Sequence, residues 1–189
     1  MLTGTARSDY LKGGADADYI KGGGGNDTIA GDGSLTANAK GSADILQGGA
    51  GNDVIFGNGG ADTIDGGSGQ DEIHGGRGAD FLAGGLGADR FVFGVDTLDG
   101  AIDRIRDFSS GQKDRVDLSI LDARSGTANI NEAFTFIGKA EFHGVEGEVR
   151  YEVLGRNANV TADMDGDGAA DLKIVLVDVS KLVAGDFIL

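Results

Sequence analysis

The chain of 189 residues has no cysteine, proline or tryptophan, and only 6% of its residues are aromatic. Because there is no cysteine, no disulfide can hold the fold together, even outside the cell, and bound metal is the available substitute. Basic residues are also few: 16 Lys and Arg stand against 31 Asp and Glu, which gives a net charge of -15. This charge argues against nucleic acid and anionic membranes as partners and favours the binding of cations.

The sequence also has no long hydrophobic segment. None of its apolar runs approaches the roughly 20 residues that are needed to span a bilayer, so we expect no membrane insertion. The amino terminus, Met1–Thr5, lacks a basic region followed by a long apolar stretch. We therefore expect no cleaved amino-terminal export signal in this chain.

A nine-residue repeat, Gly-Gly-x-Gly-x-Asp-x-(large apolar)-x, runs from residue 4 to residue 92 and is clearest over residues 48–56. The sixth position is Asp in nine copies: Asp9, Asp18, Asp27, Asp44, Asp53, Asp62, Asp71, Asp80 and Asp89. The eighth position is always large and apolar: Leu11, Ile20, Ile29, Leu46, Ile55, Ile64, Ile73, Leu82 and Phe91. This nonapeptide is an established signature of calcium-binding β-helix repeats.

The chemistry of one copy explains the signature. Its glycines can adopt positive φ and point several carbonyl oxygens into one concavity, to which the Asp adds a carboxylate. Calcium takes about 6–8 oxygen ligands at roughly 2.3–2.6 Å, which is more than one such loop supplies, so two loops must share an ion. The last three residues suit a very short strand with its middle side chain turned inward. Two nonapeptides therefore form one coil, and like loops stack in every second repeat.

This geometry sorts the nine aspartates into two edges. One edge holds Asp9, Asp27, Asp53, Asp71 and Asp89, and the other holds Asp18, Asp44, Asp62 and Asp80. Several calcium ions, up to about seven, fit between neighbours along the two edges. The predicted metal ligands also include loop residues of the regular copies, which are Gly48, Ala50, Gly51, Gly57, Gly59, Gly60, Gly66, Ser68, Gly69, Gly75, Arg77, Gly78, Gly84 and Gly87.

The early copies are irregular. Position four is Arg7, Asp16 and Ser42 in the first, second and fourth copies, and Asp27 and Asp44 are separated by 17 residues instead of nine. Eight extra residues near 31–38 should bulge from a turn without disturbing the stack. We expect these three copies to bind calcium poorly and those from Gly48 to Val92 to bind it firmly.

A flexible Gly-rich linker is the competing interpretation of this half. A linker has no reason to carry a large apolar residue at every ninth position. Without calcium, however, the inward carboxylates repel one another and the apolar side chains bury too little to offset the entropy of so much glycine. The sequence therefore predicts a segment that folds only when calcium neutralises it.

The second half has a different composition. Of the 36 glycines, 25 lie in residues 1–92 and 11 in residues 93–189. Strand patterns take over at residues 90–93, 102–105, 115–118, 134–137, 148–153 and 172–177, and residues 131–133 suit a helical turn. The predicted fold is all-β: a parallel β-roll over residues 4–92, with calcium between stacked loops, and a β-sandwich-like cap over residues 93–189 that covers the last coil.

Two acidic clusters lie in the cap. Asp163, Asp165, Asp167 and Asp171 occupy positions 1, 3, 5 and 9 of an EF-hand-like loop, but Ile174 stands where the bidentate Glu belongs. Calcium binding and a solvated acidic turn both remain open for this cluster. Residues 107–114 form a loop bounded by carboxylates, which from the sequence alone is an ordinary turn.

Taken together, the chain resembles the carboxy-terminal region of serralysin-type metalloproteases and other RTX proteins exported by type I secretion. The resemblance rests on the nonapeptides and on residues 89–93, 105–108, 114–119, 163–171 and 186–189. It implies that Asp107 and Asp114 contribute to a calcium site beside the roll. It also implies that Asp186–Leu189 belongs to an uncleaved export signal, although these residues can equally form a last strand.

The resemblance does not extend to catalysis. The zinc-binding His-Glu-x-x-His motif is missing, and the two histidines, His74 and His143, are most simply surface residues. The sequence also has no Gly-x-Ser-x-Gly motif. A free-standing enzyme is thus the weakest interpretation.

The leading interpretation is a secreted, non-catalytic calcium-binding module. It would fold outside a bacterial cell and support type I secretion and extracellular folding of an attached protein, such as a catalytic domain, with calcium ions and the secretion machinery as partners. The alternative is a carbohydrate-binding accessory module of an alginate-modifying enzyme. Binding of an acidic polysaccharide would need calcium or a basic strip, for which Arg104, Arg106, Arg115 and Arg124 are candidates.

Overall fold

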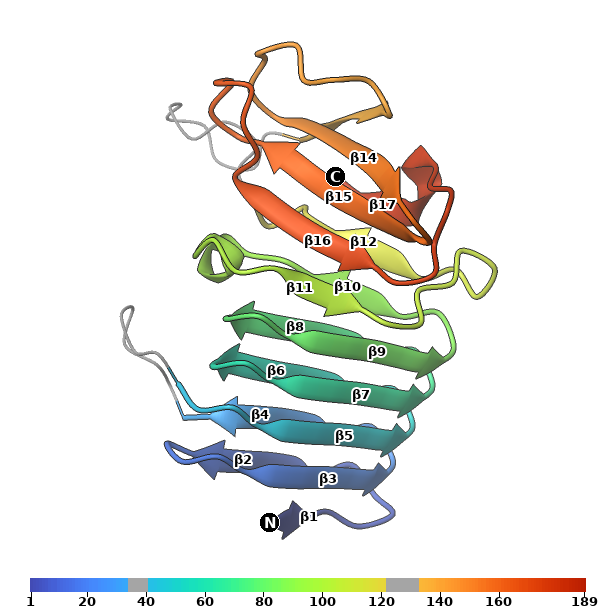
Figure 1. The fold of residues 1–189 in the computed structure, drawn as a ribbon. Helices are drawn as coiled ribbons and strands as arrows, with labels where there is room; N and C mark the ends of the chain where they lie inside the picture. Colours follow the sequence, from blue (N-terminus) through green and yellow to red (C-terminus); the bar gives the residue numbers. More distant parts are fainter. Residues whose placement is uncertain (34–40, 122–132) are drawn as a thin grey trace.

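Short strands alternate between two sheets, so that the chain winds upward as a flattened coil from its amino terminus (Figure 1). The computed structural model describes residues 1–33, 41–121 and 133–189. One sheet has ten strands in the order β1-β3-β5-β7-β9-β11-β16-β15-β14-β13, and the other has seven in the order β17-β12-β10-β8-β6-β4-β2. The roll strands are β1 (Leu2–Thr3), β2 (Tyr10–Gly14), β3 (Tyr19–Gly24), β4 (Thr28–Asp32), β5 (Ile45–Ala50), β6 (Val54–Gly59), β7 (Thr63–Ser68), β8 (Glu72–Arg77), β9 (Phe81–Leu86) and β10 (Arg90–Val92).

The register of these strands places every eighth-position side chain between the two sheets. In the first sheet Ile20 pairs with Leu46, Leu46 with Ile64, and Ile64 with Leu82. In the second sheet Leu11, Ile29, Ile55, Ile73 and Phe91 follow one another in the same way. All these side chains except Leu11 are fully buried. The core of the roll is therefore two ladders with one apolar residue from each nonapeptide.

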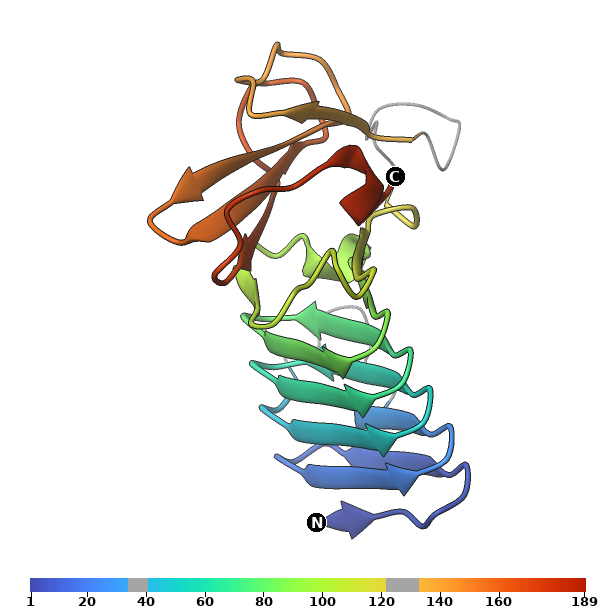
Figure 2. The same cartoon turned by 90° about the vertical axis from the view of Figure 1, so that its right-hand side faces the viewer.

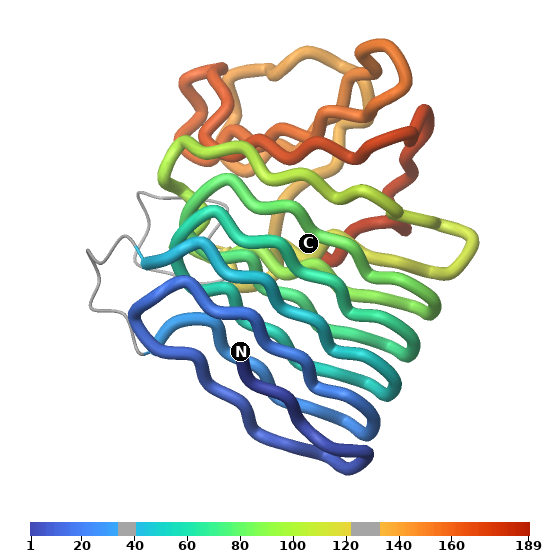
Figure 3. The backbone as a smooth tube through the Cα atoms, turned by 60° about the horizontal axis from the view of Figure 1, so that its bottom comes forward, coloured from blue at the N-terminus to red at the C-terminus, as the bar shows by residue number. Residues whose placement is uncertain are grey.

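All strand pairs within the roll are parallel. The turns that join the two sheets line up along two edges, as the views in Figures 2 and 3 show. The strands on either side of the irregular copy, β4 and β5, keep their register with β6 and β7. Most of the predicted insertion lies outside the described residues, so its bulging from a turn stays a prediction.

The cap continues both sheets of the roll. Its elements are η1 (Val95–Thr97), β11 (Asp103–Ile105), β12 (Arg115–Asp117), β13 (Thr135–Gly138), β14 (Glu148–Leu154), β15 (Asn157–Asp163), β16 (Leu172–Leu176), η2 (Ala184–Asp186) and β17 (Phe187–Ile188). β11 pairs with β9 and β12 pairs with β10, both in parallel, while β14, β15 and β16 are antiparallel. The last coil of the roll therefore has no free strand edge on either side.

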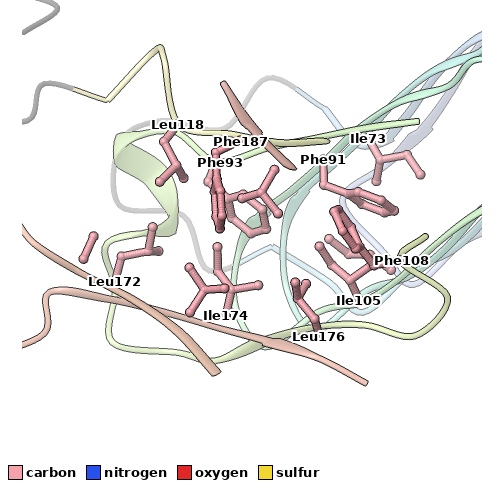
Figure 4. Close-up of a cluster of buried hydrophobic side chains, with 14 of the residues drawn as sticks. Ile73, Phe91, Phe93, Ile105, Phe108, Leu118, Leu172, Ile174, Leu176 and Phe187 are labelled. Atoms are coloured by element: carbon pink, nitrogen blue, oxygen red, sulfur yellow. The ribbon is translucent and has the colours of Figure 1, made fainter. Parts of the chain in front are cut away.

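A larger hydrophobic cluster lies where the cap meets the roll (Figure 4). Phe91 at the end of the roll packs against Phe108, with 6.4 Å between their ring centroids. Ile105, Ile174 and Leu176 extend the same cluster into the cap and are at most 1% exposed. The aromatic side chains thus close the thin core of the roll at its carboxy-terminal end.

The sequence anticipated this fold with few exceptions. An all-β fold with a parallel roll is confirmed, and the six strands expected from residue 90 onward correspond to β10, β11, β12, β13, β14 and β16. The strand patterns missed β15, because Asn157-Ala158-Asn159 at its start is poor in residues that favour strands. The expected helical turn at residues 131–133 begins outside the described part of the chain. Within the described residues, no helix has the length and hydrophobicity to cross a membrane.

The ladder arrangement predicts that one apolar truncation destabilises the whole roll. Ile64→Ala removes a fully buried side chain between Leu46 and Leu82, and such a cavity costs about 2–5 kcal/mol of unfolding free energy. Urea unfolding in saturating calcium measures this loss. Thr63→Ala, on the outer face of the same strand, is the matched control, and equal losses in the two variants would contradict the ladder as the source of stability.

Candidate calcium sites

The sixth-position aspartates of the nonapeptides form two columns, one along each edge of the roll. In the first column, the backbone N–H of Asp9 donates to Oδ1 of Asp27, and the same bond recurs from Asp27 to Asp53, Asp53 to Asp71 and Asp71 to Asp89, at 2.7–2.9 Å. In the second column it recurs from Asp18 to Asp44, Asp44 to Asp62 and Asp62 to Asp80, each at 2.8 Å. The expected division of the aspartates between two edges matches this bonding.

Each column continues one step into the cap. The N–H of Asp80 donates to Oδ1 of Asp103 at 2.9 Å, and the N–H of Asp89 donates to Oδ1 of Asp114 at 3.1 Å. Asp114 was among the predicted ligands, but Asp103 was not. Its signal in the sequence is the pattern Asp-x-(apolar) at Asp103–Ile105, which repeats that of Asp80–Leu82 at a longer spacing.

The second carboxylate oxygen distinguishes these aspartates from ordinary hydrogen-bonded turn residues. Oδ2 is buried and accepts no hydrogen bond from any described residue in seven members of the columns, which are Asp27, Asp44, Asp53, Asp62, Asp71, Asp80 and Asp89. A buried carboxylate oxygen without a donor is strongly unfavourable unless the group is protonated or a cation lies beside it.

The first glycine of each loop shows where such a cation fits. A methyl group at Gly48 would collide with Oδ2 of Asp53 and with the carbonyl oxygen of Gly66 in the next coil. Gly57 stands in the same relation to Asp62 and Gly75. Carboxylate and carbonyl oxygens therefore converge on a space that only glycine leaves open, and this donor set suits calcium, a hard cation.

The remaining predicted loop residues line the same edges through their backbones. The carbonyl oxygens of Ser68 and Arg77 accept hydrogen bonds from the N–H groups of Gly51 and Gly60 at 2.8 and 2.9 Å. The fourth-position glycines lie directly against the preceding coil: a methyl group at Gly69 or Gly78 would collide with the carbonyl oxygen of Gly51 or Gly60. The other predicted residues occupy the same positions in their own loops: the first position holds Gly66, Gly75 and Gly84, the third holds Ala50 and Gly59, and the fourth holds Gly87. The Arg77 side chain is not required for this arrangement.

The first copy differs from the others. Oδ2 of Asp9 accepts hydrogen bonds from the N–H and the hydroxyl of Thr5, at 2.6 and 2.8 Å. These bonds, that from the Thr5 backbone above all, lower the pKa of Asp9. The loops at Gly13, Gly22 and Gly31 resemble the regular ones, since a methyl group at each would collide with Oδ2 of Asp18, Asp27 and Asp44 respectively. Weak binding by the first, second and fourth copies stays a prediction.

Burial makes the columns costly to ionise. It raises the pKa of Asp62 and Asp71 to about 7 and that of Asp80 to about 8, and the carboxylates of neighbouring coils add to the rise by repulsion. Burial likewise raises the pKa of Asp89 to about 6 and that of Asp103 to about 7, with added repulsion from Asp114 and Asp107 at Asp89 and from Asp99 and Asp96 at Asp103. The columns therefore hold protons or require a cation near neutral pH.

Asp107 and Asp114 meet beside the last turn of the roll. Asp107 accepts hydrogen bonds from the N–H groups of Gly84 and Gly85 at 3.0 and 2.9 Å. Asp114 accepts one from Ser109 at 2.8 Å through Oδ2, in addition to its bond from Asp89. Both carboxylates add to the repulsion that raises the pKa of Asp89. The loop at residues 107–114 is thus part of the edge rather than a separate turn.

The EF-hand-like cluster is organised differently. Carboxylate oxygens of Asp163, Asp165 and Asp171 lie within 4.8 Å of one another, but Asp167 is not in this group. Backbone N–H groups of Gly166 and Gly168 donate to the two oxygens of Asp163, at 2.7 and 2.9 Å. Because the loop itself satisfies its buried carboxylate, calcium binding here stays a prediction.

Comparisons with known proteins agree with this geometry. The family model of the RTX calcium-binding nonapeptide repeat matches the chain in four copies, over residues 3–34, 39–73 and 70–96. No curated protein matches the sequence.

Among solved structures, the chain is similar to the extracellular lipase LipA from Serratia marcescens, with 15% identity and a TM-score of 0.44 over 98% of this chain and 39% of the lipase. It is also similar to the AlgE6R3 and AlgE6R2 subunits of the mannuronan C5-epimerase from Azotobacter vinelandii. The identities are 23% and 22% and the TM-scores 0.30 and 0.36, over 98% of this chain and 80% and 90% of those subunits.

The space beside Gly48, where Oδ2 of Asp53 and the carbonyl oxygen of Gly66 converge, predicts that a larger residue weakens calcium binding. Gly48→Ala should raise the calcium concentration at the midpoint of folding on the order of ten-fold, because the added methyl group takes the place of the ion between Asp53 and Gly66. Circular dichroism during a calcium titration measures the midpoint. Gly185→Ala, where an added methyl group meets nothing within 4 Å, is the control. An unchanged midpoint in the first variant would refute the assigned position.

The raised pKa values predict how metal-free protein responds to pH. A carboxyl group whose pKa is raised in the fold stabilises it below its unfolded pKa of about 4, and this stabilisation is lost as pH rises through the folded value. In chelator, strand content should therefore fall between about pH 5.5 and about pH 8. Asp80→Asn, which removes the group with a pKa of about 8, should make the upper part of this decline shallower. Strand content that rises with pH would contradict the assignment.

Proposed function

Because this chain belongs to the RTX calcium-binding repeat proteins, we propose that it is a non-catalytic module whose roll folds when calcium binds between its turns. The observation that carries the proposal is the pair of aspartate columns with buried Oδ2 atoms that no described residue satisfies. Calcium supplies the positive charge and the oxygen coordination that these columns lack.

The folding mechanism follows from the contacts of each aspartate. Oδ1 is already used by the N–H of the preceding coil, so each carboxylate is fixed with Oδ2 facing its own loop glycine and the next coil. Without a cation, the stacked charges repel and the single apolar residue in each nonapeptide compensates too little. A cation that binds only the folded roll shifts the equilibrium by mass action.

This dependence would suit export in an unfolded state. Low calcium inside a bacterial cell leaves the roll unfolded and able to pass through a type I secretion channel, and higher calcium outside folds it together with an attached protein. The last residues, Asp186–Leu189, would carry the export signal. Their position supports this role, since β17 is an edge strand that pairs with β12 among the described strands.

The histidines support a non-catalytic role. His74 lies on the outer face of β8 with its Nε2 2.7 Å from Glu72, and Nδ1 of His143 lies 2.6 Å from Glu148. Each histidine thus pairs with its own local glutamate: His74 and Glu72 lie in β8 of the seven-stranded sheet, whereas His143 lies in the loop before β14, which begins at Glu148 in the ten-stranded sheet. The pairs do not converge on a common site.

Carbohydrate binding is less well supported. Arg104 lies in β11 of the ten-stranded sheet and Arg115 in β12 of the seven-stranded sheet, so these two candidates for a basic strip face different sides. Arg124 lies outside the described residues. Calorimetry with alginate oligomers in saturating calcium separates this function from the proposed one, because a module for folding and export needs no glycan affinity.

Calcium titration tests the proposed function directly. Strand content measured by circular dichroism should be low in chelator at about pH 7.5 and should rise cooperatively towards millimolar calcium. Magnesium at the same concentration is the matched control, because it prefers a smaller octahedral site with several waters and should replace calcium poorly. The same strand content in chelator and in calcium would rule out calcium-dependent folding.

A further inference from the structure

We propose that Asp32 is an additional calcium ligand at the interrupted turn, where it joins Asp44 and Asp62 of the second column. The inference rests on the proposed function, since it concerns the same kind of site. It also reverses the expectation that the interrupted copy binds calcium poorly. The turn would instead carry one more carboxylate than a regular turn.

The place of Asp32 in the repeat is unusual. It is the last residue of β4 and pairs with Gly14 in the coil below. The regular copies have Gly49, Gly67, Gly76 or Gly85 at this second position, and Asn58 in the coil above. A carboxylate here is only 2% exposed. The insertion has therefore placed a buried charge where the regular repeat has none.

The contacts of Asp32 aim its carboxylate into the turn. Oδ2 accepts a hydrogen bond from the N–H of Ser42 at 3.1 Å, across the insertion. A methyl group at Gly41 would collide with this same oxygen and with the carbonyl oxygen of Gly59 in the next coil. A carboxylate and a carbonyl oxygen thus converge at Gly41, as they do at the first glycine of each regular loop.

The other oxygen of Asp32, Oδ1, is a second and separate indication that a cation binds here. Oδ1 is buried and accepts no hydrogen bond from any residue that the structure describes. The carboxylate is also close enough to Asp44 and Asp62 to add to the repulsion that raises the pKa of both groups, after the larger effect of burial. When ionised, these three neighbouring buried carboxylates repel one another, and a cation between them removes that repulsion.

The expected consequence is a site that binds calcium more tightly than its irregular sequence suggests, because affinity rises with the number of charged ligands. This would also give the insertion a structural role. It allows the chain to leave the turn after Asp32 and return at Gly41, so that the extra carboxylate and the Ser42 N–H are held on the same edge.

Ion counting tests the assignment in the whole chain. Native mass spectrometry and isothermal titration calorimetry with calcium alone would compare the wild type with D32N, which keeps the shape of the side chain, and D32G, which restores the regular residue. Both variants should hold one ion fewer at intermediate calcium and bind it on the order of ten-fold more weakly. E152Q is the control, since it removes one exposed charge from β14 in the cap.

The outcomes separate this inference from the proposed function. If the wild type binds calcium and folds but both variants keep its ion count and affinities, the assignment of Asp32 is wrong and the proposed function stands. If D32N loses the ion and D32G keeps it, the carboxylate is not a ligand, and the assignment is again wrong. If the wild type itself binds no calcium, both proposals fail.

Discussion

The roll depends on aspartate carboxylates in which the protein provides a hydrogen-bond donor for only one of the two oxygens. In each regular coil one oxygen of the aspartate accepts a backbone N–H from the coil before it, and the other is buried without a donor among the described residues. The hydrogen bond to the first oxygen, Oδ1, holds the carboxylate in one orientation. That orientation is unfavourable without a cation, because it keeps the second oxygen, Oδ2, buried without a donor. The same carboxylates therefore connect the coils and favour a bound cation.

Other features of the roll follow from this constraint. One Ile or Leu in each nonapeptide contributes about 1.5–3 kcal/mol when buried, while nine residues of largely glycine backbone lose about 1–2 kcal/mol each on ordering. Apolar burial alone cannot sustain such a chain. Glycine is nevertheless unavoidable, because side chains at Gly48 or Gly69 would occupy the space of the ion or collide with the neighbouring coil.

The sequence predicted the parts of this arrangement that repeat with a fixed period. The two columns, the inward ladder and the parallel register all follow from Asp at position six and an apolar residue at position eight. Asp103 was not predicted because it comes 23 residues after Asp80 instead of 18. It nevertheless accepts a hydrogen bond from the Asp80 N–H, as the aspartates within the columns do from the coil before them. Asp32 was not predicted because its proposed role depends on contacts with residues that follow the insertion, Gly41 and Ser42. The spacing of residues along the sequence does not reveal these contacts.

The cap then belongs to the calcium chemistry as well as to the core. Asp103 begins β11 and Asp114 immediately precedes β12, and these first strands beyond the roll pair with β9 and β10. The last two turns therefore receive their final carboxylates from the cap, while Phe91 and Phe108 join the two hydrophobic cores. Since Asp103 and Asp114 extend the aspartate columns at the same junction where Phe91 packs against Phe108, calcium binding at the end of the roll and folding of the cap are expected to be one cooperative event.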